Sequence, residues 1–177
     1  MKLIKDILVF SIETTGSDVE KDHIIQLSAI LLDKDNLLEK MHFNCYVKVS
    51  FLDGTISDHA AQLGIEFDQL RKSPKITEAL RDFIKTFQYE PLLATNSVQN
   101  YLFLKQAYKR NLVPFKYDNH LLDIWSLGYI YILHYGIKKI PTLTTLANHF
   151  NLKIANQNNA LEKARLTAEV LRKIING

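Results

Sequence analysis

The hydrophobic pattern of the first 50 residues is that of consecutive β-strands. The apolar run Ile7-Leu8-Val9-Phe10 predicts a buried strand over residues 6–10, and similar patterns predict strands over 23–32 and 40–49. The polar residues 33–36 separate the second and third strands, as a hairpin turn would. The chain therefore opens with three strands in a meander.

Helical spacing of apolar residues dominates the rest of the chain. After a long polar stretch over residues 50–73, for which short helical patches are predicted, one short buried strand is expected at 92–94. Pro74 and Pro141 stand where a first helical turn accepts proline. Helices are predicted from Pro74 to Phe87, over 100–110, from Asp123 to about Gly136, from Pro141 to Phe150, and over 159–175. This order indicates an α/β fold in which helices flank a mixed central sheet.

Composition narrows the protein class without identifying a partner. The chain has 177 residues, of which 47% are hydrophobic and 23% charged, and we expect one domain over 1–177. The net charge of +3 permits a polyanionic partner but does not argue for one. Cys45 is the only cysteine, which excludes an intrachain disulfide and suits a reducing cytosol. No signal peptide or membrane-spanning run is seen, so we expect a cytoplasmic protein with no membrane partner.

Several short motifs occur in an order that is typical of one nuclease family. The motif segments are Ser11-Ile12-Glu13-Thr14-Thr15-Gly16, residues 24–30, Gly64-Ile65-Glu66, residues 95–104, Asp123-Ile124, and residues 158–164. Over nearly its whole length the chain resembles the DnaQ-like, or DEDDh, 3'-5' exonucleases. The resemblance implies a ribonuclease-H-like fold.

The same resemblance casts doubt on catalysis. In the family, four carboxylates hold two divalent metal ions and a histidine acts as general base. The corresponding carboxylate positions in this chain are Ser11, Glu13, Asn100 and Lys163, and the histidine position is Asn158. The four ligand positions then sum to zero charge, whereas Mg²⁺ demands anionic oxygen ligands. A dication about 4 Å from Lys163 is opposed by several kcal/mol at an effective dielectric of about 20. We therefore expect no metal, with Mg²⁺ or Mn²⁺ relevant only if residual activity exists.

Nearby acidic residues do not replace the missing ligands. Glu162 adjoins Lys163, but one helical residue turns a side chain by about 100°. Asp18 and Asp22 are expected to be solvated, and Asp123 matches a family position outside the metal-binding quartet. Lys163 either pairs with Glu13 in the former metal site, with Ser11 and Asn100 completing the hydrogen bonds, or simply reaches solvent. Both alternatives stay open from sequence.

Part of the substrate-binding motif is retained. The resemblance implies that Thr14, Thr15 and Gly16 contact the end of a nucleic-acid strand. Further candidates for such contacts are the cationic residues Lys105, Lys109, Arg110, Lys138, Lys139 and Arg165 and the aromatic residues Tyr101, Trp125, Tyr129 and Tyr131, all of which also suit ordinary surface or core positions.

Three functions follow from these observations. The first is a catalytically inactive exonuclease-like domain that binds single-stranded DNA or RNA. The second is a protein-interaction module of a replication or repair assembly. The third is residual 3'-5' exonuclease activity at an atypical site.

Overall fold

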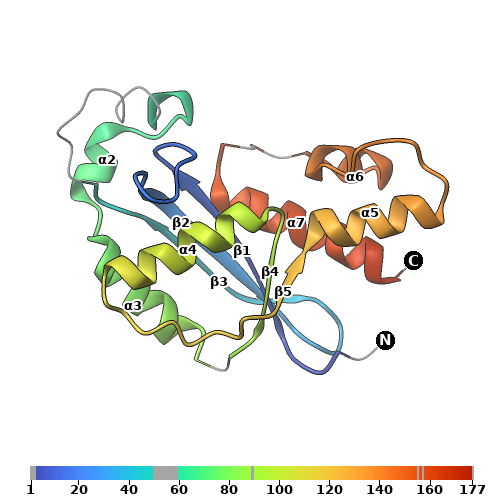
Figure 1. Cartoon of the computed structure of the whole chain (residues 1–177), viewed down its shortest axis with the longest axis horizontal. Helices are drawn as coiled ribbons and strands as arrows, with labels where there is room; N and C mark the ends of the chain where they lie inside the picture. The colour runs from blue at the N-terminus through green and yellow to red at the C-terminus, as the bar shows by residue number, and fades with distance from the viewer. Residues whose placement is uncertain (1–2, 50–59, 89, 155, 157, 177) are drawn as a thin grey trace.

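The structure is a computed structural model that describes residues 3–49, 60–88, 90–154, 156 and 158–176 (Figure 1). The strands are β1 (Ile7–Thr14), β2 (Ile24–Leu32), β3 (Glu39–Tyr46), β4 (Leu92–Thr95) and β5 (Leu121–Asp123). The helices are α2 (Phe67–Lys72), α3 (Ile76–Thr86), α4 (Val98–Arg110), α5 (Ile124–His134), α6 (Leu143–His149) and α7 (Ala160–Asn176).

The strands form one five-stranded sheet in the order β3-β2-β1-β4-β5. The first three strands pair antiparallel, as the predicted meander requires, and β4 and β5 continue the sheet parallel to β1. The carboxyl ends of β1, β4 and β5 therefore meet at one edge. The predicted mixed sheet flanked by helices is confirmed.

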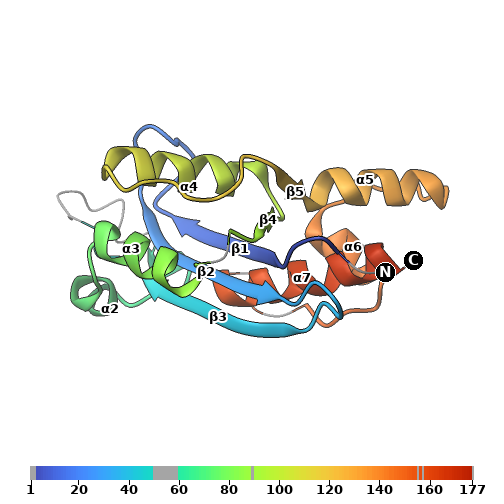
Figure 2. The same cartoon turned by 90° about the horizontal axis from the view of Figure 1, so that it is seen from below.

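Helices cover both faces of the sheet (Figure 2). On one face α3 and α4 pack against Leu8, Phe10 and Ile12, while on the other α7 packs against Ile7 and Val9. β1 can supply both cores because successive side chains of a strand point to opposite faces. It lies in the middle of the sheet, and residues 7–10 are at most 1% exposed.

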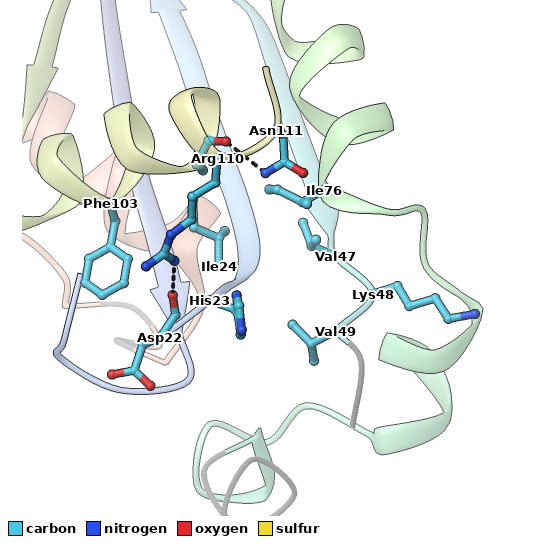
Figure 3. A pocket seen from close by; sticks show the side chains of 11 residues that line it. Asp22, His23, Ile24, Val47, Lys48, Val49, Ile76, Phe103, Arg110 and Asn111 are labelled. Atoms are coloured by element: carbon cyan, nitrogen blue, oxygen red, sulfur yellow. Dashed lines mark hydrogen bonds between the residues drawn. The ribbon is translucent and has the colours of Figure 1, made fainter. Parts of the chain in front are cut away.

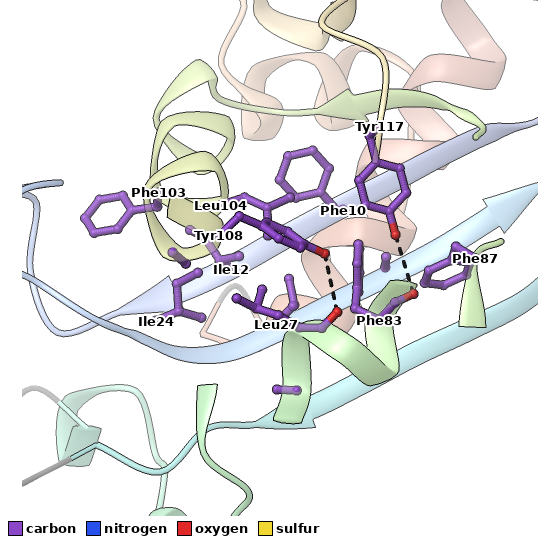
Figure 4. Packing of buried hydrophobic residues seen from close by; sticks show 14 of the residues in the cluster. Phe10, Ile12, Ile24, Leu27, Phe83, Phe87, Phe103, Leu104, Tyr108 and Tyr117 are labelled. Carbon is purple, nitrogen blue, oxygen red and sulfur yellow. Dashed lines mark hydrogen bonds between the residues drawn. The ribbon is translucent and has the colours of Figure 1, made fainter. Parts of the chain in front are cut away.

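Aromatic residues fill the core between the sheet, α3 and α4 (Figure 4). Two buried tyrosines donate hydrogen bonds to carbonyls of α3, Tyr108 to Leu80 and Tyr117 to Phe83, each at 3.5 Å. Burial raises the pKa of both phenols above the usual range, so they remain neutral donors. These bonds tie α4 and the segment after it to α3.

Strand β1 is longer than the predicted 6–10, and β3 is shorter than the predicted 40–49. Residues 11–13 remain paired with β2, with Ser11 opposite Ser28 and Glu13 opposite Gln26. The sequence pattern does not predict residues 11–13 as part of the strand, because the apolar run stops at Phe10. Residues 11–14 of the first motif thus belong to β1, and Thr15 and Gly16 follow its end.

Three predicted helix starts, those of α3, α4 and α6, are also shifted. Lys75 and Thr142 occupy the N-cap positions of α3 and α6, so Pro74 and Pro141 lie just outside the helices. α4 starts at Val98 because the Ser97 hydroxyl caps it, accepting from the Gln99 amide at 3.2 Å.

Strand β5 is absent from the predicted elements. Of the predicted polar stretch 50–73, the first ten residues lie outside the part of the chain that the structure describes. None of the described helices is long and apolar enough to cross a membrane.

Candidate functional site

The site expected from the first motif lies at the carboxyl end of β1. Ile12 points into the core beneath α4, so its neighbours Ser11 and Glu13 point to the opposite face, where α7 packs. Ser11 is 1% exposed and Glu13 5% exposed. A carboxylate is therefore buried at the place where the family holds metal.

Lys163 neutralises this buried carboxylate. Its Nζ lies 2.8 Å from Oε1 of Glu13, and its side chain is 24% exposed. The hypothesis that the lysine pairs with the retained acid is confirmed, and the alternative that it merely reaches solvent is wrong. The ammonium group of Lys163 therefore occupies the space beside the Glu13 carboxylate that a bound metal ion would need.

The first turn of α7 is fixed in position by two polar side chains. The Asn159 side chain accepts from the amides of Leu161 and Glu162 at 3.0 and 3.2 Å. Gln26, fully buried on β2, accepts from the Ala160 amide at 3.0 Å and donates to Asn44 at 2.9 Å. Gln26 and Asn159 thus hold the start of α7 in place, and this fixed position directs the Lys163 side chain toward Glu13.

The expectation that Ser11 and Asn100 complete the hydrogen bonds of this pair is wrong. The Ser11 hydroxyl is buried without a hydrogen-bond partner in the described part of the chain. The Asn100 amide instead donates to Thr95 at 2.9 Å and to Asn96 at 3.2 Å. Asn100 therefore stabilises the turn between β4 and α4, because its amide finds acceptors close by in sequence.

Asn158, at the family's general-base position, is exposed. Its side-chain amide donates to the Gln62 carbonyl at 3.3 Å, which joins the segment before α7 to the segment before α2. A side-chain amide does not take up a proton near neutral pH. Asn158 therefore cannot serve as general base.

The other acids are used elsewhere. Glu162 and Glu39 both pair with Arg165 at 3.4 Å, and Glu39 beside it raises the pKa of that guanidinium. The Asp123 carboxylate caps α5, accepting from the Ser126 amide and hydroxyl at 3.1 and 2.6 Å. Asp18 is exposed, and hydrogen bonding from the Glu20 amide lowers its pKa.

These residues do not fit a two-metal centre. The four family positions provide one carboxylate, one amide, one hydroxyl and one ammonium, with a net charge of zero. Among the described residues, no three His, Cys, Asp or Glu side chains are grouped so that they could hold a metal ion. The expectation of no metal cofactor remains a prediction, but the donor set gives it a chemical basis.

The retained residues Thr14, Thr15 and Gly16 form a tight loop around Asp22. The Thr14 hydroxyl donates to the Gly16 carbonyl at 2.6 Å, and the Thr15 hydroxyl donates to the Asp22 carboxylate at 3.0 Å. A Cβ on Gly16 would lie 2.4 Å from the Asp22 carboxylate, so a larger residue would require that carboxylate to move. Asp22 was expected to be solvated, but it organises this loop.

A small cleft, which we call the motif cleft, lies beside the loop, on the α4 side of β1. It has a volume of about 430 Å³ and is lined by Ile12, Thr14, Gly16, Ser17, Gln99, Asn100 and Phe103. Of the candidate binding residues, Thr14 and Gly16 line this cleft, whereas Thr15 does not and instead donates to the Asp22 carboxylate. Gln99 and Phe103, which also line the cleft, are not among the residues predicted from the sequence to bind a strand.

Three polar side chains on α4 hold the loop against the helix. Gln99 donates to the Ser17 carbonyl at 2.8 Å, Gln106 to the Glu20 carboxylate at 2.6 Å, and Arg110 to the Asp22 carbonyl at 3.1 Å. Their spacing of seven and four residues places them on one helix face. This polar spacing is visible in the sequence and could have identified the helix face that contacts the loop. The cleft is therefore shaped by bonds between α4 and residues 17–22.

A second pocket of about 210 Å³ adjoins the cleft and shares Phe103 with it (Figure 3). It lies between α4, the start of β2 and residues 47–49. Arg110 is the one candidate cation that borders it. The first cleft has none of the six candidate cations among its lining residues.

The remaining candidate residues lie elsewhere. Lys105 stands over the Tyr101 ring at 5.4 Å and bonds to Asn119 at 3.3 Å, and Arg165 pairs with acids as described. Tyr131 packs with Tyr135 and Phe150. Trp125 and Tyr129 lie on α5, while Lys109, Lys138 and Lys139 are exposed. None of these aromatic rings lines the motif cleft.

Known proteins share both the fold and the sequence pattern. The structure superposes on the nuclease domain of 3'hExo, a DEDDh family member bound to rAMP, with a TM-score of 0.82 and 16% identity, covering 99% of this chain and 94% of that one. It also matches exonuclease I with a TM-score of 0.79 and 17% identity, covering 97% of this chain and 41% of that one. The ribonuclease-H-like fold is thereby shown.

Sequence relatives are DNA polymerase III proteins. The PolC-type polymerase of Bacillus subtilis is 29% identical over 169 residues, which cover 95% of this chain but only 11% of the polymerase. The DNA polymerase III subunit epsilon of Aquifex aeolicus is 28% identical over 169 residues, covering 95% of this chain and 79% of the subunit. The family model RNase_T, described as exonuclease, matches residues 8–171. The chain therefore belongs to the DnaQ-like branch of the RNase_T exonuclease family.

Proposed function

We propose that this chain is an exonuclease-fold domain that no longer hydrolyses phosphodiesters and holds the end of a single nucleic-acid strand in the cleft beside Thr14 and Gly16. The observation that carries the proposal is the 2.8 Å ion pair between Lys163 and Glu13. Two-metal hydrolysis needs carboxylates free to bind cations and a base for the attacking water. Here the retained carboxylate faces an ammonium, and Asn158 stands where the base would be.

Single-strand binding is supported by the parts of the site that do not need metal. The cleft keeps Thr14 and Gly16 at its rim and the apolar side chains of Ile12 and Phe103 on its wall. Single strands bind such surfaces through stacking and backbone contacts. Among the structural neighbours, exonuclease I has been crystallised with a dT13 oligonucleotide. We infer the same class of ligand for this chain.

The sequence relatives suggest the setting. They are polymerase III proteins, so we infer a role in DNA replication or repair, in the cytoplasm. Binding to a replication protein is the second candidate function, and the exposed apolar side chains of α5 favour it. Residual exonuclease activity is the third and is an outcome of the following test.

The test combines binding and cleavage on fluorescent single-stranded DNA and RNA, with EDTA, Mg²⁺ or Mn²⁺. We expect anisotropy to report binding that weakens with salt and is unchanged by EDTA, with no shortening of the strand. Thr14→Glu should weaken binding at least about tenfold, because it places an anion at the cleft. Gln88→Glu adds the same charge beyond α3, near the opposite end of β1, and should leave affinity unchanged.

Two results would overturn the proposal. Cleavage by the parent chain that Glu13→Ala abolishes would show a working active site. Absence of binding to any strand, in a chain whose circular dichroism shows it folded, would remove the nucleic-acid function.

A further inference from the structure

Helix α5 is apolar on all sides, yet only part of it is buried. No Asp, Glu, Lys or Arg occurs between Asp123 and Lys138. Ile124, Gly128 and Ile132 face the interior, and a Cβ on Gly128 would lie 2.5 Å from a Leu146 methyl carbon, so α5 and α6 are in close contact there. A helix that is hydrophobic all round is normally buried on every side.

The opposite side of α5 is exposed to solvent. The large apolar side chains on this side are Trp125, Tyr129, Ile130 and Leu133, and Ile140, in the segment between α5 and α6, is also exposed; we call these five side chains the α5 face. Their exposed fractions run from 45% to 70%. Trp125, Tyr129 and Leu133 are spaced four residues apart and therefore share one line along the helix. Clustered exposed apolar residues of this kind mark interaction sites.

The aromatic part of the α5 face is already ordered. The rings of Trp125 and Tyr129 stack with centroids 5.5 Å apart and an interplanar angle of 7°. A partner that covers them would order few additional side chains. This lowers the entropic cost of binding.

The charged residues that follow the α5 face along the chain are positive. No acidic residue occurs from residue 124 to residue 161, whereas Lys138 and Lys139 follow α5 directly and are exposed. A second copy of the chain would bring the same lysines to the contact. A nucleic-acid strand would gain little from the aliphatic side chains of Ile130, Leu133 and Ile140. An apolar partner with acidic flanks matches both features.

We propose that the α5 face binds an amphipathic helix of a partner protein. Apolar side chains of that helix pack against Trp125, Tyr129 and Leu133, and its acidic residues lie near Lys138 and Lys139. This inference does not depend on whether the motif cleft binds nucleic acid, because the two surfaces share no residues.

Trp125 provides a direct readout, because it is the only tryptophan in the chain. The probe is a synthetic tryptophan-free amphipathic peptide of about 18 residues with a leucine stripe flanked by glutamates; a matched peptide carries lysines instead. We expect the glutamate peptide to shift Trp125 emission to shorter wavelength and to bind at least about tenfold tighter than the lysine peptide. Raising the salt concentration should narrow this difference.

Variants locate the contact. Leu133→Glu should abolish the shift, and the double change Lys138→Glu with Lys139→Glu should invert the preference between the two peptides. Leu112→Glu is the control, since Leu112 is 91% exposed at the end of α4 and outside the α5 face. It should bind like the parent chain.

Three outcomes would overturn the proposal. The first is equal binding, or no binding, of the two peptides. The second is a concentration-dependent shift of Trp125 emission without peptide, with dimers in sedimentation, which would make a second copy the occupant. The third is saturable quenching of Trp125 by oligo(dT) that Leu133→Glu removes, which would assign the face to a nucleic-acid strand.

Discussion

The ammonium of Lys163 lies 2.8 Å from the carboxylate of Glu13, and this ion pair joins the first turn of α7 to the end of β1. The Glu13 side chain is 6% exposed and the Lys163 side chain 24% exposed, so the carboxylate is buried and the lysine is partly solvated. At the position where the family binds metal ions, the cation beside the Glu13 carboxylate is therefore the ammonium group of Lys163. The ion pair therefore has consequences for both stability and metal binding.

Removing the lysine alone should destabilise the fold. We expect Lys163→Met to lower the free energy of unfolding by about 2–3 kcal/mol, below the full cost of breaking a buried pair because the lysine is partly solvated. Lys173→Met makes the same change at an exposed position of α7 and should cost less than about 0.5 kcal/mol. Urea denaturation measures both variants.

The double variant Lys163→Met with Glu13→Gln separates charge from packing. It should recover a large part of the loss, since no buried charge remains without its counter-ion. Equal stability of Lys163→Met and the parent chain would contradict a stabilising pair.

Restoring the family's ligand set should restore metal binding. The variant Ser11→Asp, Asn100→Asp, Asn158→His and Lys163→Asp brings the four ligand positions to the charge that hard cations need. We expect it to bind Mn²⁺ in electron paramagnetic resonance titrations. The parent chain should leave the Mn²⁺ signal unchanged.

The variant with the first three changes that retains Lys163 is the matched control. It should bind Mn²⁺ at least about tenfold more weakly, because the ammonium opposes the dication. Mn²⁺ binding by the parent chain at the strength of the restored variant would refute the view that the lysine replaces the metal.

Weakening the bonds from α4 should loosen the motif loop. Gln99→Ala removes the donor to the Ser17 carbonyl, and we expect the amides of residues 17–22 to exchange up to about fivefold faster, in line with a loss of about 1 kcal/mol. Hydrogen-exchange mass spectrometry gives this rate. Lys109→Ala, an exposed change on the same helix, should leave it unaltered, and unchanged exchange in Gln99→Ala would show that the loop is held by other contacts.

Gly16 should be intolerant of any side chain. Gly16→Ala places a methyl group against the Asp22 carboxylate, which accepts from the Thr15 hydroxyl and the Asp18 amide, and should cost about 1–3 kcal/mol. In an Asp22→Ala background the same change should cost much less, because the obstructing group is gone. Thermal unfolding of the parent chain, the two single variants and the double variant tests this. If the losses of stability from the two changes simply add, the contact between residue 16 and the Asp22 carboxylate is not the cause.

The sequence predicted most elements because their apolar spacing is regular. The four strands expected from it and the five predicted helices all overlap observed ones, and α7 agrees to within one residue at each end. It failed where polar residues continue a strand, as at Ser11 and Glu13, and where a strand is as short as β5. In both places tertiary pairing, rather than local hydrophobicity, decides the structure.

The sequence by itself determined the family, the meander that opens the fold, and the loss of four of the five catalytic side chains, because residue identity alone fixes charge and donor type. Only the tertiary structure decided that Lys163 reaches Glu13, that Asn100 turns to Thr95 and Asn96, and that Asp22 organises the loop around Gly16. Each of these depends on distances between residues far apart in sequence or on competition between nearby acceptors. Such distances exist only once β1, α4 and α7 have packed together.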